Sequence, residues 1–204
     1  MKASNIQGGL LNISQAQHKA AGEVVELVAA KIGKGRAVHP ETAISASARL
    51  AGSLLLRSFN LNLDKYAPGA IILSHEANEK GPVLINSLSG YLSALKVQLD
   101  KQKLSGKQTL RGGEPQLDIL GVLSLLQESA LEIGKTNQLS VEQTAHAAAL
   151  ATGFLVKECA PQIGAETGFN IAAFGFVEGS KTVPPRIFDA FPVHYQAKPW
   201  YKFW

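Results

Sequence analysis

The first stretch of regular hydrophobic patterning indicates a helix from about Ser14 to Ile32. Its apolar positions recur every three or four residues, the spacing of one helix face: Ala21, Val25, Val28 and Ile32. Ser14 and Gln17 have the spacing of a capping box, in which each side chain bonds the other residue's backbone N–H. We therefore predict that the helix begins at Ser14.

Two further segments are apolar on nearly all sides, which is typical of central, buried helices. One runs from Pro40 to about Phe59, and Pro40 suits the first position of a helix. The other runs from Ser140 to Cys159 and is expected to stop before Pro161. Small residues recur every fourth position in the first of these, which predicts close approach by another helix: Ala43, Ser47 and Ala51.

Two amphipathic segments complete the predicted helices. They run from Gly81-Pro82 to about Leu99 and from about Pro115 to Gly134. The fold class is thus predicted to be mainly α, a bundle of about five helices.

The rest of the chain predicts less regular structure. Phe169–Val177 favours a strand because of its aromatic and β-branched residues, and it can pair with Ala70–Leu73 as a minor two-stranded element. We assign residues 1–160 to a helical domain. Residues 161–204 form an extended C-terminal segment that packs on this domain or on a partner subunit.

The final 17 residues are rich in aromatic side chains. Leaving so much apolar area in water is unfavourable, so we expect these side chains to pack against another surface. These candidate interaction residues are Phe188, Phe191, Tyr195, Trp200, Tyr201, Phe203 and Trp204. The tail covers the chain's own helices or a second subunit, and a membrane or a foreign protein is the third alternative. A homodimer formed through this tail is one predicted partnership.

Composition is that of one soluble domain with a packed core. The chain has 204 residues, of which 46% are hydrophobic and 18% charged, and one cysteine, which excludes an internal disulfide. Neither a secretory signal nor an apolar run long enough for a membrane span is evident, so we expect a cytoplasmic protein without a membrane partner. The net charge of +4 is modest and does not favour nucleic acid as a partner. Its excess gathers near residues 101–111, either a solvated connection or an anion-contacting surface.

No catalytic or cofactor signature stands out. Nucleophile-elbow, phosphate-loop and dinucleotide-binding spacings are missing from the sequence, so an enzyme is not favoured and no cofactor is expected. His75 and Glu79 are one helical turn apart and are weak candidates for metal ligands, but a capped surface turn is the favoured explanation of this pair.

Polar residues inside the apolar helices are the remaining candidates for a site: Arg49, Asp118 and His146. A buried charge needs a partner, and Asp118 is a plausible one for Arg49. Arg49 can instead extend its charged end to the surface, or hold an anionic ligand near His146.

Two functions from different classes follow. The first is a non-catalytic interaction or assembly protein that forms a homo-oligomer through its tail. The alternative is a small-molecule-binding protein or enzyme with an inter-helix pocket lined by Arg49, Asp118 and His146. The sequence specifies neither a substrate nor a partner.

Overall fold

The computed structural model describes residues 13–33, 39–104 and 115–187, and in these residues the chain forms six α-helices and one short 3₁₀ turn. They are α1 (Gln15–Ile32), α2 (Pro40–Ser58), η1 (Leu63–Lys65), α3 (His75–Ala94), α4 (Ile119–Thr136), α5 (Val141–Ile163) and α6 (Ala165–Lys181). The mainly α fold class is confirmed, with six helices in the described ranges instead of about five. None of these described helices has the length and apolar character needed to cross a membrane.

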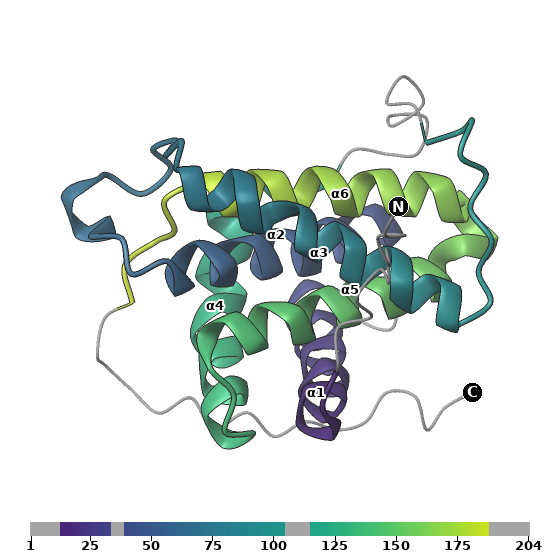
Figure 1. Ribbon diagram of the computed structural model, residues 1–204, viewed down its shortest axis with the longest axis horizontal. Helices are drawn as coiled ribbons and strands as arrows, with labels where there is room; N and C mark the ends of the chain where they lie inside the picture. The colour runs from purple at the N-terminus through teal and green to yellow at the C-terminus, as the bar shows by residue number, and fades with distance from the viewer. Residues whose placement is uncertain (1–12, 34–38, 105–114, 188–204) are drawn as a thin grey trace, which may run out of the picture.

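Helix α2 lies at the centre of the bundle. In Figure 1, α2, α3, α5 and α6 run lengthwise, whereas α1 and α4 extend across them at a steep angle. Helix α2 packs most extensively on α6 and α5, and sixteen of its nineteen residues are buried. The prediction that an apolar helix at 40–59 is central is confirmed.

Helices α2 and α6 approach each other backbone to backbone. Gly52 on α2 faces Phe176 and Ser180, and Gly175 and Gly179 on α6 face the α2 backbone around Arg49. A methyl group at Gly175 would lie 2.7 Å from the Ala48 Cβ, and one at Gly179 would touch the Arg49 carbonyl oxygen. Side chains at these positions would separate the helices, so the close packing depends on glycine.

The opposite side of α2 packs on α5 through small polar residues. The Ser47 hydroxyl donates to the Ala148 carbonyl at 3.3 Å, and the Thr152 hydroxyl donates to the Ser47 oxygen at 2.9 Å. Both hydroxyl groups are buried and hydrogen-bonded, as buried polar groups must be to avoid a desolvation cost. The small-residue ridge predicted on α2 therefore does admit a close neighbour at Ser47.

Helix ends agree with the sequence where caps are strong. Ser14 and Ser140 each form the predicted capping box, and α2 begins at Pro40. Prolines misled the prediction elsewhere: α3 begins at His75 and contains Pro82, and α5 continues through Pro161 to Ile163. Packing of both helices on the core outweighs the lost backbone hydrogen bond of each proline.

The predicted strand at Phe169–Val177 is wrong, because this segment lies within α6. Gly168, Ala172, Gly175 and Gly179 recur at helical spacing and are buried against the bundle, a pattern the aromatic residues between them concealed. Within the described residues, the segment Ala70–Leu73 forms one antiparallel bridge, between Ile71 and Thr182. Residues 165–181 of the predicted extension thus form a helix packed in the same bundle.

Candidate functional site

Arg49 is held inside the bundle by two partners. Its Nε donates to the Glu178 carboxylate on α6 and its Nη1 donates to the Leu117 carbonyl, both at 2.6 Å. The Arg49 side chain is buried and the Glu178 carboxylate partly so. Of the three roles considered for Arg49, the structure forms an ion pair, and its partner is Glu178 instead of Asp118.

Asp118 lies next to this ion pair but serves the start of α4. It is the N-cap residue of that helix, and its exposed carboxylate accepts a hydrogen bond from the Gly121 N–H at 2.7 Å. A carboxylate at this position also stabilises the positive end of the helix dipole. Arg49 and Asp118 are brought together through Leu117, the residue before the cap.

His146 lies on α5 and faces α3. Its Nδ1 is 3.4 Å from the Ser87 hydroxyl oxygen. Burial lowers the pKa of His146, with Glu142 opposing and Lys80 adding to that effect, so the ring is neutral at pH 7. Neither of the two cavities described below, both within the described residues, is lined by Arg49, Asp118 or His146, and a ligand-binding role for these residues stays a prediction.

The metal candidates His75 and Glu79 share one exposed face of α3. Their side chains form an ion-pair contact of 3.3 Å, with exposed fractions of 82% and 68%. Within residues 13–33, 39–104 and 115–187, no group of three or more His, Cys, Asp or Glu side chains is placed to hold a metal ion. The pair alone offers two ligands, fewer than the three or four protein ligands of typical zinc sites.

Two sequence predictions fall on other parts of the chain. The seven aromatic residues of the tail, between 188 and 204, lie outside the described residues. Most of the basic segment 101–111 does too, since description stops at residue 104 and resumes at 115.

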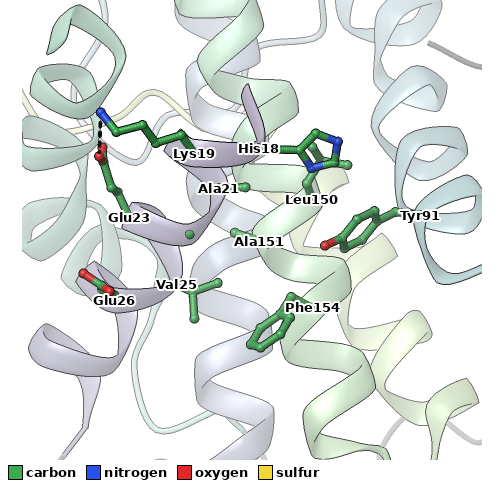
Figure 2. A pocket seen from close by; sticks show the side chains of 11 residues that line it. His18, Lys19, Ala21, Glu23, Val25, Glu26, Tyr91, Leu150, Ala151 and Phe154 are labelled. Carbon is green, nitrogen blue, oxygen red and sulfur yellow. Dashed lines mark ion pairs between the residues drawn. The ribbon is translucent and has the colours of Figure 1, made fainter. Parts of the chain in front are cut away.

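The larger of the two cavities is a groove of about 400 Å³ where α1, α3 and α5 meet. Its volume is within the range typical of ligand sites, about 300–1,000 Å³. Figure 2 shows the rings of Tyr91 and Phe154 on one side of α1, and Lys19, Glu23 and Glu26 on the other. We call this cavity the α1 groove. Its lining residues are His18, Lys19, Ala21, Gly22, Glu23, Val25, Glu26, Tyr91, Leu150, Ala151 and Phe154.

The α1 groove joins an apolar wall to an acidic rim. On the rim, Glu23 is engaged by Lys19 at 3.5 Å and by the Asn137 amide at 2.7 Å. Glu26 has no ion pair within the described residues, so the three charged residues of the groove sum to −1. A ligand suited to this lining has aromatic or aliphatic bulk and a positive charge beside it.

Tyr91 brings both an aromatic face and a polar end to the α1 groove. Its ring centroid is 6.3 Å from that of His18 at an interplanar angle of 46°. Burial raises the pKa of Tyr91, partly offset by Lys157, which keeps the phenol protonated. The hydroxyl, with no hydrogen bond in the described part of the chain, can donate to or accept from a ligand.

Glycines shape the groove on two sides. Gly22 lies within α1, and a methyl group there would have nothing within 4 Å, so the missing side chain leaves the groove open. Gly153 on α5 makes room for a wall of the groove instead, because a methyl group there would lie 2.8 Å from a Tyr91 ring carbon. A glycine inside a helix costs roughly 1 kcal/mol relative to alanine, which makes Gly22 an unfavourable choice for helix stability alone.

Sequence reasoning missed this groove, although one signal was present. An isolated glycine within a strongly periodic helix often has a packing or binding reason, and Gly22 is such a residue. Tyr91 and Phe154, which line the groove together with Gly22, lie on two other helices. The sequence does not specify that these helices pack beside α1.

Cys159 is predicted to be chemically inert. Burial, reinforced by the carboxylates of Glu158 and Glu41, raises the pKa of its thiol to about 11. Because the thiolate is the reactive form, raising the pKa from 9.0 to about 11 lowers the reactive fraction about 100-fold at pH 8. We expect the native thiol to react with a disulfide reagent about 100-fold more slowly than the same chain in denaturant. Equal rates would show that Cys159 is accessible as thiolate.

No protein-family model, curated protein or solved structure matches this chain.

Proposed function

We propose that this protein is a non-catalytic assembly protein, in which the α1 groove of one copy binds the aromatic segment Lys198–Trp204 of a second copy. The observation that supports this most directly is the chemistry of the groove, an apolar wall beside the carboxylate of Glu26, which makes no ion pair within the described residues. A self-recognising chain of this kind would form a homodimer with two equivalent junctions.

The proposed occupant matches that lining. The segment reads KPWYKFW and combines four aromatic side chains with two lysines, Lys198 and Lys202. Tryptophan and tyrosine, when buried in a pocket, are the side chains that contribute most to protein interfaces. Glu26 offers a carboxylate for one lysine, while Tyr91 and Phe154 offer aromatic surface for the rings.

Chain length permits the exchange. Seventeen residues follow Ile187, the last described residue. The ten of them that precede Lys198 span at most about 36 Å at roughly 3.3–3.6 Å per extended residue, so the docking segment can lie well away from Ile187. Docking on the groove of its own chain is the competing arrangement, so solution mass is the measurement that distinguishes exchange from self-docking.

Intrinsic fluorescence tests occupancy of the groove. The chain's two tryptophans are Trp200 and Trp204, so tryptophan emission reports the tail alone. We expect blue-shifted emission in the native protein and a shift to the solvent-exposed wavelength in Gly22→Leu, whose side chain fills the groove. Gly90→Leu is the matched control, because it also adds a side chain where nothing lies within 4 Å, on a helical glycine outside the lining. Emission unchanged in Gly22→Leu would mean that the tail binds elsewhere.

Light scattering then tests assembly between copies. We expect a dimer for the full chain, and a dissociation constant raised about thirtyfold or more for Gly22→Leu and for Trp200→Ala/Trp204→Ala, as when an interface loses an aromatic anchor. Mixing these two variants should restore a mixed dimer, because one supplies the tail and the other the open groove. A monomeric full chain with blue-shifted emission would contradict assembly and assign the tail to its own groove.

The alternative function is a small-molecule site at Arg49, Asp118 and His146. Arg49 has donors committed to Glu178 and Leu117, and Asp118 caps α4, which supports structural roles for both. This site becomes the favoured candidate if the tail variants leave both the tryptophan emission and the solution mass unchanged.

A further inference from the structure

The smaller cavity lies at the C-terminal end of α2 and shares no lining residue with the α1 groove. It encloses about 220 Å³ between the last turn of α2, η1 and the segment 183–187. Its polar lining comes from Arg57, Arg186, Tyr66 and Asp64. We call it the Arg57 cavity.

The Arg57 guanidinium is partly buried, and burial lowers its pKa, while the negative charge of Asp64, beyond ion-pair distance, partly opposes that effect. Among the described residues, the hydrogen bonds of Arg57 come from its Nη2, which donates to the Gln127 side chain at 2.7 Å and to the Pro185 carbonyl at 3.0 Å. Within the described residues, its Nε is sealed from solvent and bonds to nothing, and no carboxylate lies within ion-pair distance. Leaving a buried donor unpaired costs free energy, and a charged donor costs more than a neutral one.

Arg186 places a second guanidinium at the same cavity. It is exposed, and its Nη2 donates to the backbone carbonyl of Asp64 at 3.2 Å, so its positive charge is not neutralised by that contact. The Asp64 carboxylate also lines the cavity and makes no ion pair in the described part of the chain. Two guanidinium groups against one carboxylate give the lining a net charge of +1.

We infer that the Arg57 cavity is a binding site for a small oxyanion, a carboxylate or a phosphate. Guanidinium groups donate paired hydrogen bonds to both kinds of anion, and the Tyr66 hydroxyl adds a further donor. Leu63, Val183 and Pro184 supply an apolar wall on which a short alkyl group of an organic acid can pack. The site also adjoins the Pro185 carbonyl, which accepts hydrogen bonds from Arg57 and Gln127.

Calorimetric titration of the full chain tests this inference with two probes, inorganic phosphate and butyrate, at constant ionic strength. We expect saturable binding of at least one probe, about tenfold weaker binding in Arg186→Gln, and tighter binding in Asp64→Asn, since that change removes a competing negative charge. Lys31→Gln is the control for net charge alone, because Lys31 is exposed on α1, away from the cavity.

The outcomes separate cleanly. Tighter binding of butyrate would identify an organic carboxylate as the ligand class, and tighter binding of phosphate would identify a phosphate. A response to both probes no larger than that to chloride, or binding unaffected by Arg186→Gln, would overturn the site. Since Gly22→Leu alters only the α1 groove, a normal titration of that variant would show that the two sites are independent.

Discussion

Gly179→Ala is expected to destabilise the fold by about 3 kcal/mol or more, although alanine is the better helix former. The added methyl group would touch the Arg49 carbonyl oxygen and lie 2.9 Å from the Ser53 nitrogen. Both neighbours are backbone atoms of the central helix, so neither can move aside without moving α2 itself. The strain therefore reaches every helix that packs on α2.

The measurement is urea unfolding followed by circular dichroism, with Gly90→Ala as the matched control. Gly90 is also helical, but a methyl group there has nothing within 4 Å. We expect that control to gain roughly 0.5–1 kcal/mol, the usual benefit of alanine over glycine in a helix. If both variants were stabilised alike, α2 and α6 could not be in backbone contact.

Elements with strong local signals were predictable from the sequence. Ser14 and Ser140 define their helix starts, because a capping box depends on residues only three positions apart. The apolar composition of residues 40–59 likewise predicted a central helix, because a helix that is buried on all sides carries few charged residues on any face.

Longer-range features were not predictable in the same way. Phe169–Val177 has strand-like composition, and only the packing of Gly175 and Gly179 on α2 explains why it is helical. Partner choice is equally non-local: Arg49 needs an acid, but Glu178 lies 129 positions away.

The same limit applies to the candidate sites. Within each helix, the residues that line the α1 groove form no distinctive sequence pattern. The groove exists only because α1, α3 and α5 meet. The Arg57 cavity joins the end of α2 to residues near 185, which the sequence presents as a proline-rich break. A single sequence can identify polar residues in apolar helices as candidates, but it does not show which of them line the same cavity.

Arg49→Met is the second substitution expected to have a large effect, a loss of about 3 kcal/mol in the free energy of unfolding. Removing one partner of a buried ion pair typically costs about 3–5 kcal/mol, and the lower end applies because 26% of the Glu178 side chain is exposed and can be rehydrated. The Leu117 carbonyl loses its donor as well, so the start of α4 should open more often.

A double-variant cycle measures how much of this loss belongs to the pair. Arg49→Met/Glu178→Gln should be less destabilised than the sum of the two single variants, because the glutamine leaves no unpaired charge behind. Lys135→Met is the surface control: its ion pair with Glu132 is 3.7 Å long and both side chains are largely exposed, so the expected change is within about 0.5 kcal/mol.

Hydrogen exchange distinguishes a structural Arg49 from a ligand-binding one. If Arg49 holds the segment before α4, amide exchange in Arg49→Met should accelerate at Gly121 and Val122, whose N–H groups bond to Asp118. An Arg49 poised for an anionic ligand would instead leave these amides protected and the stability little changed. In that event the ion pair with Glu178 would be dispensable, and the pocket predicted around Arg49, Asp118 and His146 would become the leading candidate.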